Sequence, residues 1–468
     1  MSRFLSASGC ALVLLISDRP CTGQALVPFG PEFRVNTNTT GQEYGASVAV
    51  SGTGEFVVVW TGPDDATTGI LGRRFAASGA PLSGEFRVNT YTSGTQISAA
   101  VARSAAGGFV VVWRGNGQGD DLGIFGQRYD ASGAAQGQEF RVNTFTTQNQ
   151  KYPRIGMNAA GDFVVAWQSQ NQASATSGYD IYAQRYNAGG VPQAGEFLVN
   201  TTTTSTQMTG SVAFGANQFV IGYDGYLPSD ATGVGARLYN AFGDPFGTGF
   251  QVNTYTTNTQ GASSAAMTPA GDFLVAWSSG LEDGAGNGVF VQRFSAGGAA
   301  LNAPFRVNAT TTGAESGPVA ATEGARFVVV WRSNQVTTNG YDVFVRTVSL
   351  SGAPTGGELR VNTFTTGIQT GAKVAAGPTG NFVVVWESNN QESATSGVDL
   401  YARLLRPSGD VDGNGVLNVN DVFYLINFLF AGGPPPLGPA NPDGLGSTDV
   451  ADVFYLINFL FAGGPAPV

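Results

Sequence analysis

The sequence contains no histidine, and its two cysteines, Cys10 and Cys21, both lie near the N-terminus. Without histidine, Ser-His and Cys-His nucleophiles and most zinc or copper sites are excluded. No Gly-rich phosphate loop stands between a strand and a helix. Paired carboxylates, as in glycosidases, are the catalytic arrangement that this composition still allows.

Charged residues make up only 12% of the 468 residues, and lysine is nearly absent. The 23 basic residues comprise 21 arginines and 2 lysines, against 33 acidic residues, so the formal net charge is -10. A chain this acidic is poorly suited to phosphate backbones or anionic membranes. We therefore expect no nucleic-acid partner, and a surface built from Thr, Ser, Asn, Gln and Gly.

The first 25 residues have the pattern of an export signal. Arg3 precedes the apolar stretch 11–16, and small residues around Ala25 offer a cleavage site after Ala25. Both cysteines fall inside this segment, so we expect a mature protein without disulfides. The apolar stretch is too short to span a bilayer, and no later segment is apolar enough to do so. The expected location is extracellular, either free or attached to the cell surface.

One unit is repeated seven times after residue 30, at spacings of 53 to 57 residues. Each copy opens with a tetrad like Phe-Arg-Val-Asn, which starts at Phe33, Phe86, Phe140, Phe197, Phe250, Phe305 and Leu359. A Phe-Val-Val-x-Trp segment follows and ends at Trp60, Trp113, Trp167, Tyr223, Trp277, Trp331 and Trp386. A last segment carries Arg74, Arg128, Arg185, Arg237, Arg293, Arg346 or Arg403. Residues needed at equivalent places in every copy indicate packing roles for the Trp and Arg sets.

Each unit has four segments typical of strands, which in the second copy are 86–89, 98–102, 109–113 and 124–129. The segment ending in Trp is apolar on both faces, so neighbouring sheets must cover it on both sides. Stacking the copies around an axis achieves this, and seven lies within the usual range of about 4 to 8 propeller blades. We predict a mainly β fold with a seven-bladed β-propeller over residues 26–406. A β-helix is the alternative.

The longer loops, which follow the first and third strands of each unit, should emerge on one face of the propeller. This loop face carries Asp64, Asp65, Asp120, Asp121, Asp180, Asp230, Glu282, Asp283, Asp342 and Asp399. Two interpretations are open. The acidic side chains bind sugar hydroxyls or calcium, or they accept local hydrogen bonds that suit Gly-rich turns.

The composition changes at Gly409, where residues 410–421 fit a twelve-residue EF-hand-type loop. Gly415 stands at position 6, where such a loop turns sharply. Calcium prefers six to eight oxygen ligands. The candidate ligands are the side chains of Asp410, Asp412, Asn414, Asn418 and Asp421 and the carbonyl of Val416.

A second loop, residues 441–452, has the same pattern with one gap. Its candidate ligands are Asn441, Asp443, Asp449, Asp452 and the carbonyl of Ser447. Leu445 occupies position 5 and has no side-chain oxygen. We therefore predict two Ca²⁺ sites, the second weaker than the first.

Each loop leads into the same fourteen residues, at 421–434 and 452–465, which predict a short apolar helix that ends at Gly-Gly-Pro. Paired loops with Asp at position 12, each followed by a helix, make residues 407–468 resemble the type I dockerin family. The resemblance implies a small all-α domain with paired EF-hand-type calcium loops that docks onto a cohesin-like or other protein. Neither helix contains Lys or Arg, so we expect apolar contact with the partner. Packing of the helices on each other alone is the alternative.

The preferred hypothesis is a secreted calcium-binding protein with a noncatalytic, glycan- or protein-binding propeller and a dockerin-like docking module. The alternative is a component of a polysaccharide catabolic system with O-glycosyl hydrolase activity on the loop face. In that case the enzyme would use carboxylates. A purely structural role in a surface layer is a third hypothesis.

Overall fold

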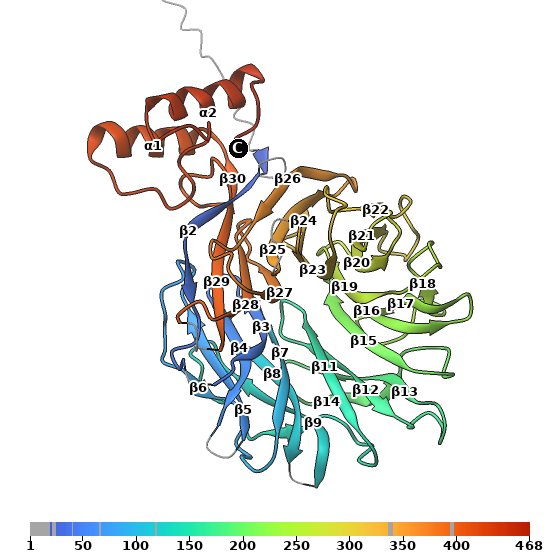
Figure 1. Ribbon diagram of the computed structural model, residues 1–468. Coiled ribbons are helices and arrows are strands. Elements are labelled where there is room, and N and C mark those ends of the chain that lie inside the picture. Colours follow the sequence, from blue (N-terminus) through green and yellow to red (C-terminus); the bar gives the residue numbers. More distant parts are fainter. Residues whose placement is uncertain are drawn as a thin grey trace, which may run out of the picture.

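The computed structural model describes residues 19–20, 25–39, 41–64, 67–117, 119–335, 340–393 and 397–468. The predicted export signal lies outside these residues, apart from Arg19, Pro20 and Ala25, and so does Asp65. The described chain forms seven four-stranded antiparallel sheets around a central axis, with two helices beside them (Figure 1). The predicted seven-bladed propeller is therefore confirmed.

Within six blades the strands follow in chain order from the axis outward. The first three blades are β3 (Tyr44–Val50), β4 (Phe56–Pro63), β5 (Thr68–Phe75) and β6 (Phe86–Arg87); β7 (Gln96–Arg103), β8 (Phe109–Gly117), β9 (Asp120–Tyr129) and β10 (Phe140–Arg141); and β11 (Gln150–Met157), β12 (Phe163–Gln170), β13 (Tyr179–Tyr186) and β14 (Pro192–Leu198). The next three are β15 (Gln207–Phe214), β16 (Gln218–Leu227), β17 (Asp230–Asn240) and β18 (Phe250–Gln251); β19 (Gln260–Met267), β20 (Phe273–Gly280), β21 (Asn287–Phe294) and β22 (Phe305–Arg306); and β23 (Glu315–Thr322), β24 (Arg326–Ser333), β25 (Asp342–Ser349) and β26 (Pro354–Arg360).

The seventh blade joins the two ends of the repeat region. It consists of β27 (Gln369–Ala376), β28 (Phe382–Asn389), β29 (Val398–Pro407) and, as its outer strand, β2 (Leu26–Arg34). Leu26 is opposite Pro407 and Arg34 is opposite Tyr401 in this pairing. The sequence unit and the blade are thus offset by one strand, because each Phe-Arg-Val-Asn segment completes the blade before its own. This offset closes the ring without a free edge between the first and last blades.

The central strand of each blade is covered on both faces, as its composition predicts. In β4, Val58 and Trp60 pack with Val385 of the seventh blade. The alternate residues Val57 and Val59 pack with the second blade. Because successive side chains of a strand point to opposite faces, one continuous apolar run belongs to two neighbouring cores. The core is therefore a ring of interfaces between blades.

All six tryptophans lie in these interfaces and are almost fully buried, which confirms their packing role. Trp113 Nε1 donates to Gln96 Oε1 at 2.9 Å, and the corresponding bond of the third blade has the same partner types. In the first blade Trp60 Nε1 donates instead to a carboxylate, Glu43 Oε2, at 2.6 Å. In these three blades the indole is thus bonded to the residue at the start of the innermost strand, whereas the indole N–H groups of Trp277, Trp331 and Trp386 have no hydrogen-bond partner in the described chain.

The arginine set occupies two registers. Counted from the phenylalanine four residues before the Trp or Tyr of the central strand, Arg74, Arg128, Arg185 and Arg293 pair with the second residue, whereas Arg237, Arg346 and Arg403 pair with the third. Successive positions point to opposite faces of the sheet, so the sets reach different neighbours. Arg74 donates to carbonyls of the next blade, and Arg403 Nη1 donates to Val361 O of the preceding blade at 2.7 Å. Both registers connect blades.

The C-terminal module, residues 407–468, contains helices α1 (Val419–Ala431) and α2 (Val450–Ala462) and the short strand β30 (Val416–Leu417), which pairs with β1 (Arg19–Pro20). The helices pack on each other through Val422, Leu425, Val453 and Leu456. Each ends at a glycine with positive φ, Gly432 or Gly463, as the Gly-Gly-Pro sequence predicts. Neither helix of the described chain has the length and hydropathy that a membrane crossing needs.

The module packs against the closing blade at the end where β29 leaves the propeller (Figure 1). Gly415 approaches so closely that a Cβ built there would lie 2.8 Å from Thr379 Cα, in the turn between β27 and β28. Ser408 N–H donates to Ala25 O at 3.0 Å. The module contacts the β27–β28 turn, whereas the β28–β29 loop belongs to the loop face. These two connections lie at opposite ends of β28, so the module leaves the loop face of the propeller open.

We predict that Glu43→Gln stabilises the protein at pH 8 but not at pH 5. Burial raises the pKa of Glu43 to about 7, and among the described residues its buried Oε1 has no hydrogen-bond partner. A carboxyl pKa above the unfolded value means that stability is lost as the pH rises through about 7. The expected gain in the free energy of unfolding at pH 8 is about 1–2 kcal/mol, measured by denaturant titration. Gln96→Glu, the reverse change, should lose stability as the pH rises; equal effects at both pH values would contradict the argument.

Candidate metal centre

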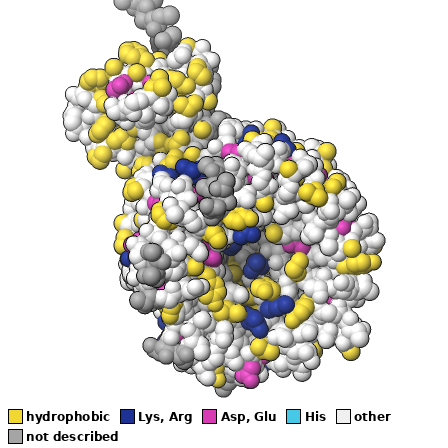
Figure 2. All heavy atoms as spheres, in the orientation of Figure 1, with side chains coloured by type: hydrophobic (Ala, Val, Ile, Leu, Met, Phe, Trp, Pro, Cys, Tyr) yellow, Lys and Arg dark blue, Asp and Glu magenta, His cyan; other side chains and the backbone are white. Residues whose placement is uncertain are grey.

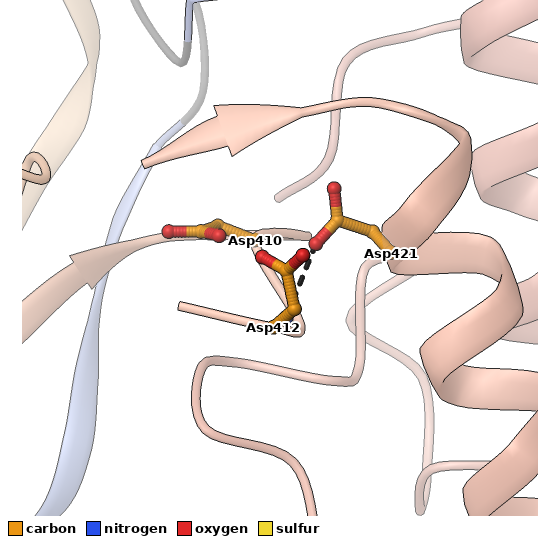
Figure 3. A group of neighbouring side chains, drawn as sticks. All are labelled: Asp410, Asp412 and Asp421. Atoms are coloured by element: carbon orange, nitrogen blue, oxygen red, sulfur yellow. Dashed lines mark hydrogen bonds between the residues drawn. The ribbon is translucent and has the colours of Figure 1, made fainter. Parts of the chain in front are cut away.

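Three carboxylates of the first predicted calcium loop converge. One oxygen each of Asp410, Asp412 and Asp421 lie within 4.8 Å of one another, and Figure 3 shows Asp412 and Asp421 facing each other with Asp410 beside them. Asp410 and Asp421 are fully buried. Among the described residues this is the one cluster of at least three acidic, histidine or cysteine side chains with such geometry.

Main-chain donors hold these carboxylates in place. Asp421 lies in the first turn of α1 and accepts N–H bonds from Val411 at 2.8 Å, Asp412 at 3.1 Å and Asn418 at 2.9 Å. Asp410 Oδ2 accepts from Gly415 N–H at 3.0 Å. The other oxygen, Asp410 Oδ1, is buried and has no hydrogen-bond partner in the described chain. The loop therefore positions a carboxylate oxygen that is available to a ligand.

The electrostatics of the cluster favour a bound cation. Burial raises the pKa of Asp410 to about 6 and that of Asp421 to about 7, and the charge of Asp412 raises both. Arg406 opposes the shift at Asp410 only in part. Buried carboxylates of like charge are unfavourable unless they are protonated or bind a cation. Carboxylate oxygens suit a hard divalent ion such as calcium, so these three residues fit part of the ligand set of the predicted metal.

The other predicted ligands of the first loop lie beside the cluster. Asn414 is exposed; its Oδ1 accepts from Val416 N–H at 2.7 Å and its Nδ2 donates to Asp412 Oδ2 at 2.8 Å. Asn418 is the N-cap of α1, where its Oδ1 accepts from Asn420 N–H at 2.7 Å. Val416 belongs to β30. Sequence spacing alone does not indicate that position 9 of the loop also caps the helix.

The second loop has the same framework with fewer converging carboxylates. Asp452 is buried and accepts N–H bonds from Asp449 at 2.8 Å and Asp443 at 3.4 Å. Asp449 caps α2, and Ser447 is exposed. Asn441 Oδ1 is buried without a hydrogen-bond partner in the described chain. Burial raises the pKa of Asp452. The arrangement parallels the first loop without its carboxylate trio.

No protein-family model matches the sequence, and no curated protein matches it. Solved structures do match. The polysaccharide lyase Uly1 has a TM-score of 0.49 and 10% identity, over 81% of this chain and 100% of its own. The α-L-arabinofuranosidase Arb93A of Fusarium graminearum has a TM-score of 0.46 and 12% identity, over 69% of this chain and 98% of its own. A protein of unknown function from Dyadobacter fermentans DSM 18053 has a TM-score of 0.47 and 11% identity, over 82% and 99%. These likenesses concern the fold, and the dockerin resemblance stays a prediction.

The acidic residues of the loop face mostly serve the turns. Asp180 Oδ1 accepts from Asn200 Nδ2 at 2.7 Å, and Asn200 Oδ1 accepts from Ile181 N–H at 2.7 Å. The same Asp–Asn bond is formed by Asp120, Asp230, Asp283, Asp342 and Asp399. The asparagine comes from the Phe-Arg-Val-Asn segment. These hydrogen bonds support the second of the two interpretations, in which the acidic residues stabilise turns.

Sequence reasoning missed a group of charged residues at the axis of the propeller. A cavity of about 280 Å³ is lined by all seven innermost strands and contains Arg154, Asp224 and Lys373. A sequence signal for Arg154 and Lys373 does exist: at the same position of the repeat, most copies have a small or apolar residue and others have a charged one. The sequence shows such differences, but the register that brings those positions to one axis comes only from the structure.

We predict that Asp410→Asn has opposite effects with and without calcium. In chelator at pH 8 the variant should protect α1 better, because it removes a buried charge whose raised pKa makes stability fall as the pH passes about 6. In millimolar calcium it should protect α1 less, because a ligand is lost. We expect about 1 kcal/mol in each direction, measured by hydrogen exchange of α1 in the full chain.

Asp449→Asn is the matched control in chelator, since it removes the same charge from an exposed N-cap and keeps a capping side chain. It should leave α1 protection unchanged. Destabilisation by Asp410→Asn in both conditions would mean that the carboxylate has only a structural role.

Proposed function

We propose that this chain is a secreted calcium-binding protein in which the C-terminal module docks onto a partner protein and the propeller is a noncatalytic binding platform. The observation that carries the proposal is the convergence of Asp410, Asp412 and Asp421, of which Asp410 and Asp421 are fully buried. Two findings support the assignment of separate roles to the module and the propeller. The module leaves the loop face open, and six of the acidic residues of that face are engaged in Asp–Asn bonds.

The first calcium ion would be held by the carboxylate trio, with Asn414, Asn418 and the Val416 carbonyl nearby. The second would be held by Asn441, Asp443, Asp449, Asp452 and the Ser447 carbonyl. Calcium supplies positive charge that neutralises the buried carboxylates. The residues of the loops then fix the start of each helix, because Asp421 and Asp452 accept N–H bonds from the residues at the N-caps. Ion binding and helix order are therefore linked.

The two helices offer an apolar surface for docking. Phe423 and Phe430 of α1 are 62% and 67% exposed, and Phe454 and Phe461 of α2 are 65% and 50% exposed. Figure 2 shows hydrophobic side chains spread over much of the visible face of the module. Large exposed aromatic residues in a group are typical of protein interaction sites. The partner that fits is a protein with a complementary apolar face, such as a cohesin-like domain.

Calcium titration of the full chain should show two sites, the tighter removed by Asp412→Ala and the weaker by Asp443→Ala. We expect dissociation constants of roughly 10⁻⁴–10⁻³ M, as in extracellular modules. Isothermal titration calorimetry measures both the number of sites and the affinities. Asp244→Ala, at an exposed turn of the propeller, should change neither. If the chain takes up no calcium, or if Asp412→Ala leaves both sites intact, the assignment of the metal centre is wrong.

The double variant Phe423→Ser/Phe454→Ser should weaken docking onto an immobilised type I cohesin domain by about tenfold or more. Binding should require calcium and should be measured on the full chain by surface plasmon resonance. Leu301→Ser removes an exposed apolar side chain from the propeller and should have no effect. Absence of calcium-dependent binding by the unmodified chain would refute a cohesin partner. Release of reducing sugar from polysaccharides by the chain would refute the noncatalytic propeller.

A further inference from the structure

The axial cavity of the propeller is lined mainly by small side chains and by two cations. Each innermost strand contributes one residue to a ring around the axis. In every blade this residue is paired with the residue just before the Trp or Tyr of the central strand. The ring consists of Ser47, Ala100, Arg154, Ser211, Ser264, Val319 and Lys373. All seven line the cavity. Five are small or apolar, and the third and seventh blades supply Arg154 and Lys373. The ring is therefore not a packing repeat.

Neither cation has a carboxylate partner at salt-bridge distance among the described residues. Within the described part of the chain, Arg154 donates only to the carbonyls of Gly210 and Pro153, both at 3.0 Å. Lys373 Nζ makes one long bond, 3.5 Å, to Ala372 O. Burial, and next the charge of Arg154, lowers the pKa of Lys373 to about 8, so the two cations are close enough to repel each other. Two like charges are thus held beside one cavity.

Two nearby acids offset part of this charge, Asp224 at Arg154 and Glu387 at Lys373, but neither forms a salt bridge with them in the described chain. Asp224 lines the cavity, but its carboxylate accepts Ser263 N–H at 3.1 and 3.3 Å, and burial raises its pKa to about 6. Glu387 Oε1 accepts from Gly45 N–H at 2.8 Å. Both acids are occupied by the backbone of the next blade. An anion from outside would meet two cations that have no carboxylate at salt-bridge distance among the described residues.

Further cations stand above the cavity toward the loop face. Arg114 and Arg332 follow the tryptophans of their blades, and Lys151 faces the ring of Tyr179 at 3.7 Å. Figure 2 shows Lys and Arg side chains gathered in the central hollow. Both lysines of the chain, Lys151 and Lys373, are among these residues, although the chain as a whole carries a net charge of -10. Basic residues thus occur both in the ring at the axis and farther along the strands toward the loop face.

We propose that this axial channel binds an acidic sugar, with its carboxylate or sulfate group between Arg154 and Lys373. The inference deepens the proposed function of the propeller as a binding platform and rests on it. The walls favour a sugar over an acidic peptide, because Ser47, Ser211 and Ser264 offer hydroxyls and no large apolar pocket for peptide side chains is present among the lining residues. The volume of about 280 Å³ lies just below the ~300–1,000 Å³ of small-ligand sites and suits one acidic unit of a chain.

Three matched oligosaccharides test the proposal by calorimetry on the full chain at low salt: an oligogalacturonate, a sulfated galactan oligomer and a neutral galactan oligomer. At least one acidic oligomer should bind, the neutral one should not, and the acidic oligomer that binds identifies the anionic group.

Arg154→Met and Lys373→Met should each weaken binding by about tenfold or more, because charge-assisted hydrogen bonds are lost. Arg306→Met, at the outer strand β22, should bind as the unmodified chain does. Equal affinity for the neutral oligomer, no binding of either acidic oligomer, or intact binding by the double variant Arg154→Met/Lys373→Met would overturn the proposal.

Thermal unfolding separates a binding role from a structural one. Because Lys373 is repelled by Arg154, Lys373→Met should raise the unfolding temperature in the absence of ligand, followed by tryptophan fluorescence. The oligosaccharide that binds should raise the unfolding temperature of the unmodified chain and not that of the double variant. A lower unfolding temperature for Lys373→Met would show that the lysine stabilises the fold and would overturn the proposal. Both measurements are made in chelator, so their outcomes do not depend on whether the calcium sites are correctly assigned.

Discussion

A strand that is apolar on both faces cannot be satisfied within its own sheet, and the architecture of this protein follows from that constraint. Val58 and Trp60 of β4 pack in one direction and Val57 and Val59 in the other, so each blade needs two neighbours. A linear stack would leave two apolar faces in water, whereas a closed ring leaves none. Closure requires the first and last copies to meet, and the N-terminal strand β2 completes the seventh sheet with β27–β29. The offset between sequence unit and blade is therefore part of how the ring closes.

The features that depend on local pattern could be predicted from the sequence. The four strands of each unit, the burial of the tryptophans and the Gly-terminated helices follow from periodicity and residue type. The two arginine registers could not be predicted, because Arg237 and Arg185 differ by one position relative to the central strand and loops of different length hide that shift. The role of the repeated asparagine was also hidden, since its partners, such as Ile181 and Asp180 for Asn200, lie about twenty residues earlier. Pairing across that distance is determined by the sheet register.

In the candidate metal centre, too, some features could be predicted from the local sequence pattern and others could not. Loop spacing identified Asp410, Asp412 and Asp421, which the structure brings together. It did not indicate that Asn418 and Asp449 cap the helices, because capping depends on where each helix begins, and both begin two residues before the segment that apolar composition suggests. The proximity of the axial cations could not be predicted from the sequence for a different reason. Arg154 and Lys373 are far apart in the sequence, and only closure of the ring brings their strands to one axis.

The two proposed sites depend on one physical device, a pair or trio of like charges held together by the main chain. Backbone N–H groups orient Asp421 and Asp410 toward each other, and backbone carbonyls orient Arg154 toward the cavity that Lys373 also lines. Free side chains of like charge would separate, so the backbone bonds and the surrounding packing must oppose the repulsion in the absence of ligand. A ligand of opposite charge then gains the attraction of all the groups without ordering them first. Departures from local electrostatic complementarity of this kind are expected at functional sites. In this protein they occur where the repeat pattern ends, in the module, and where it varies, at the axis.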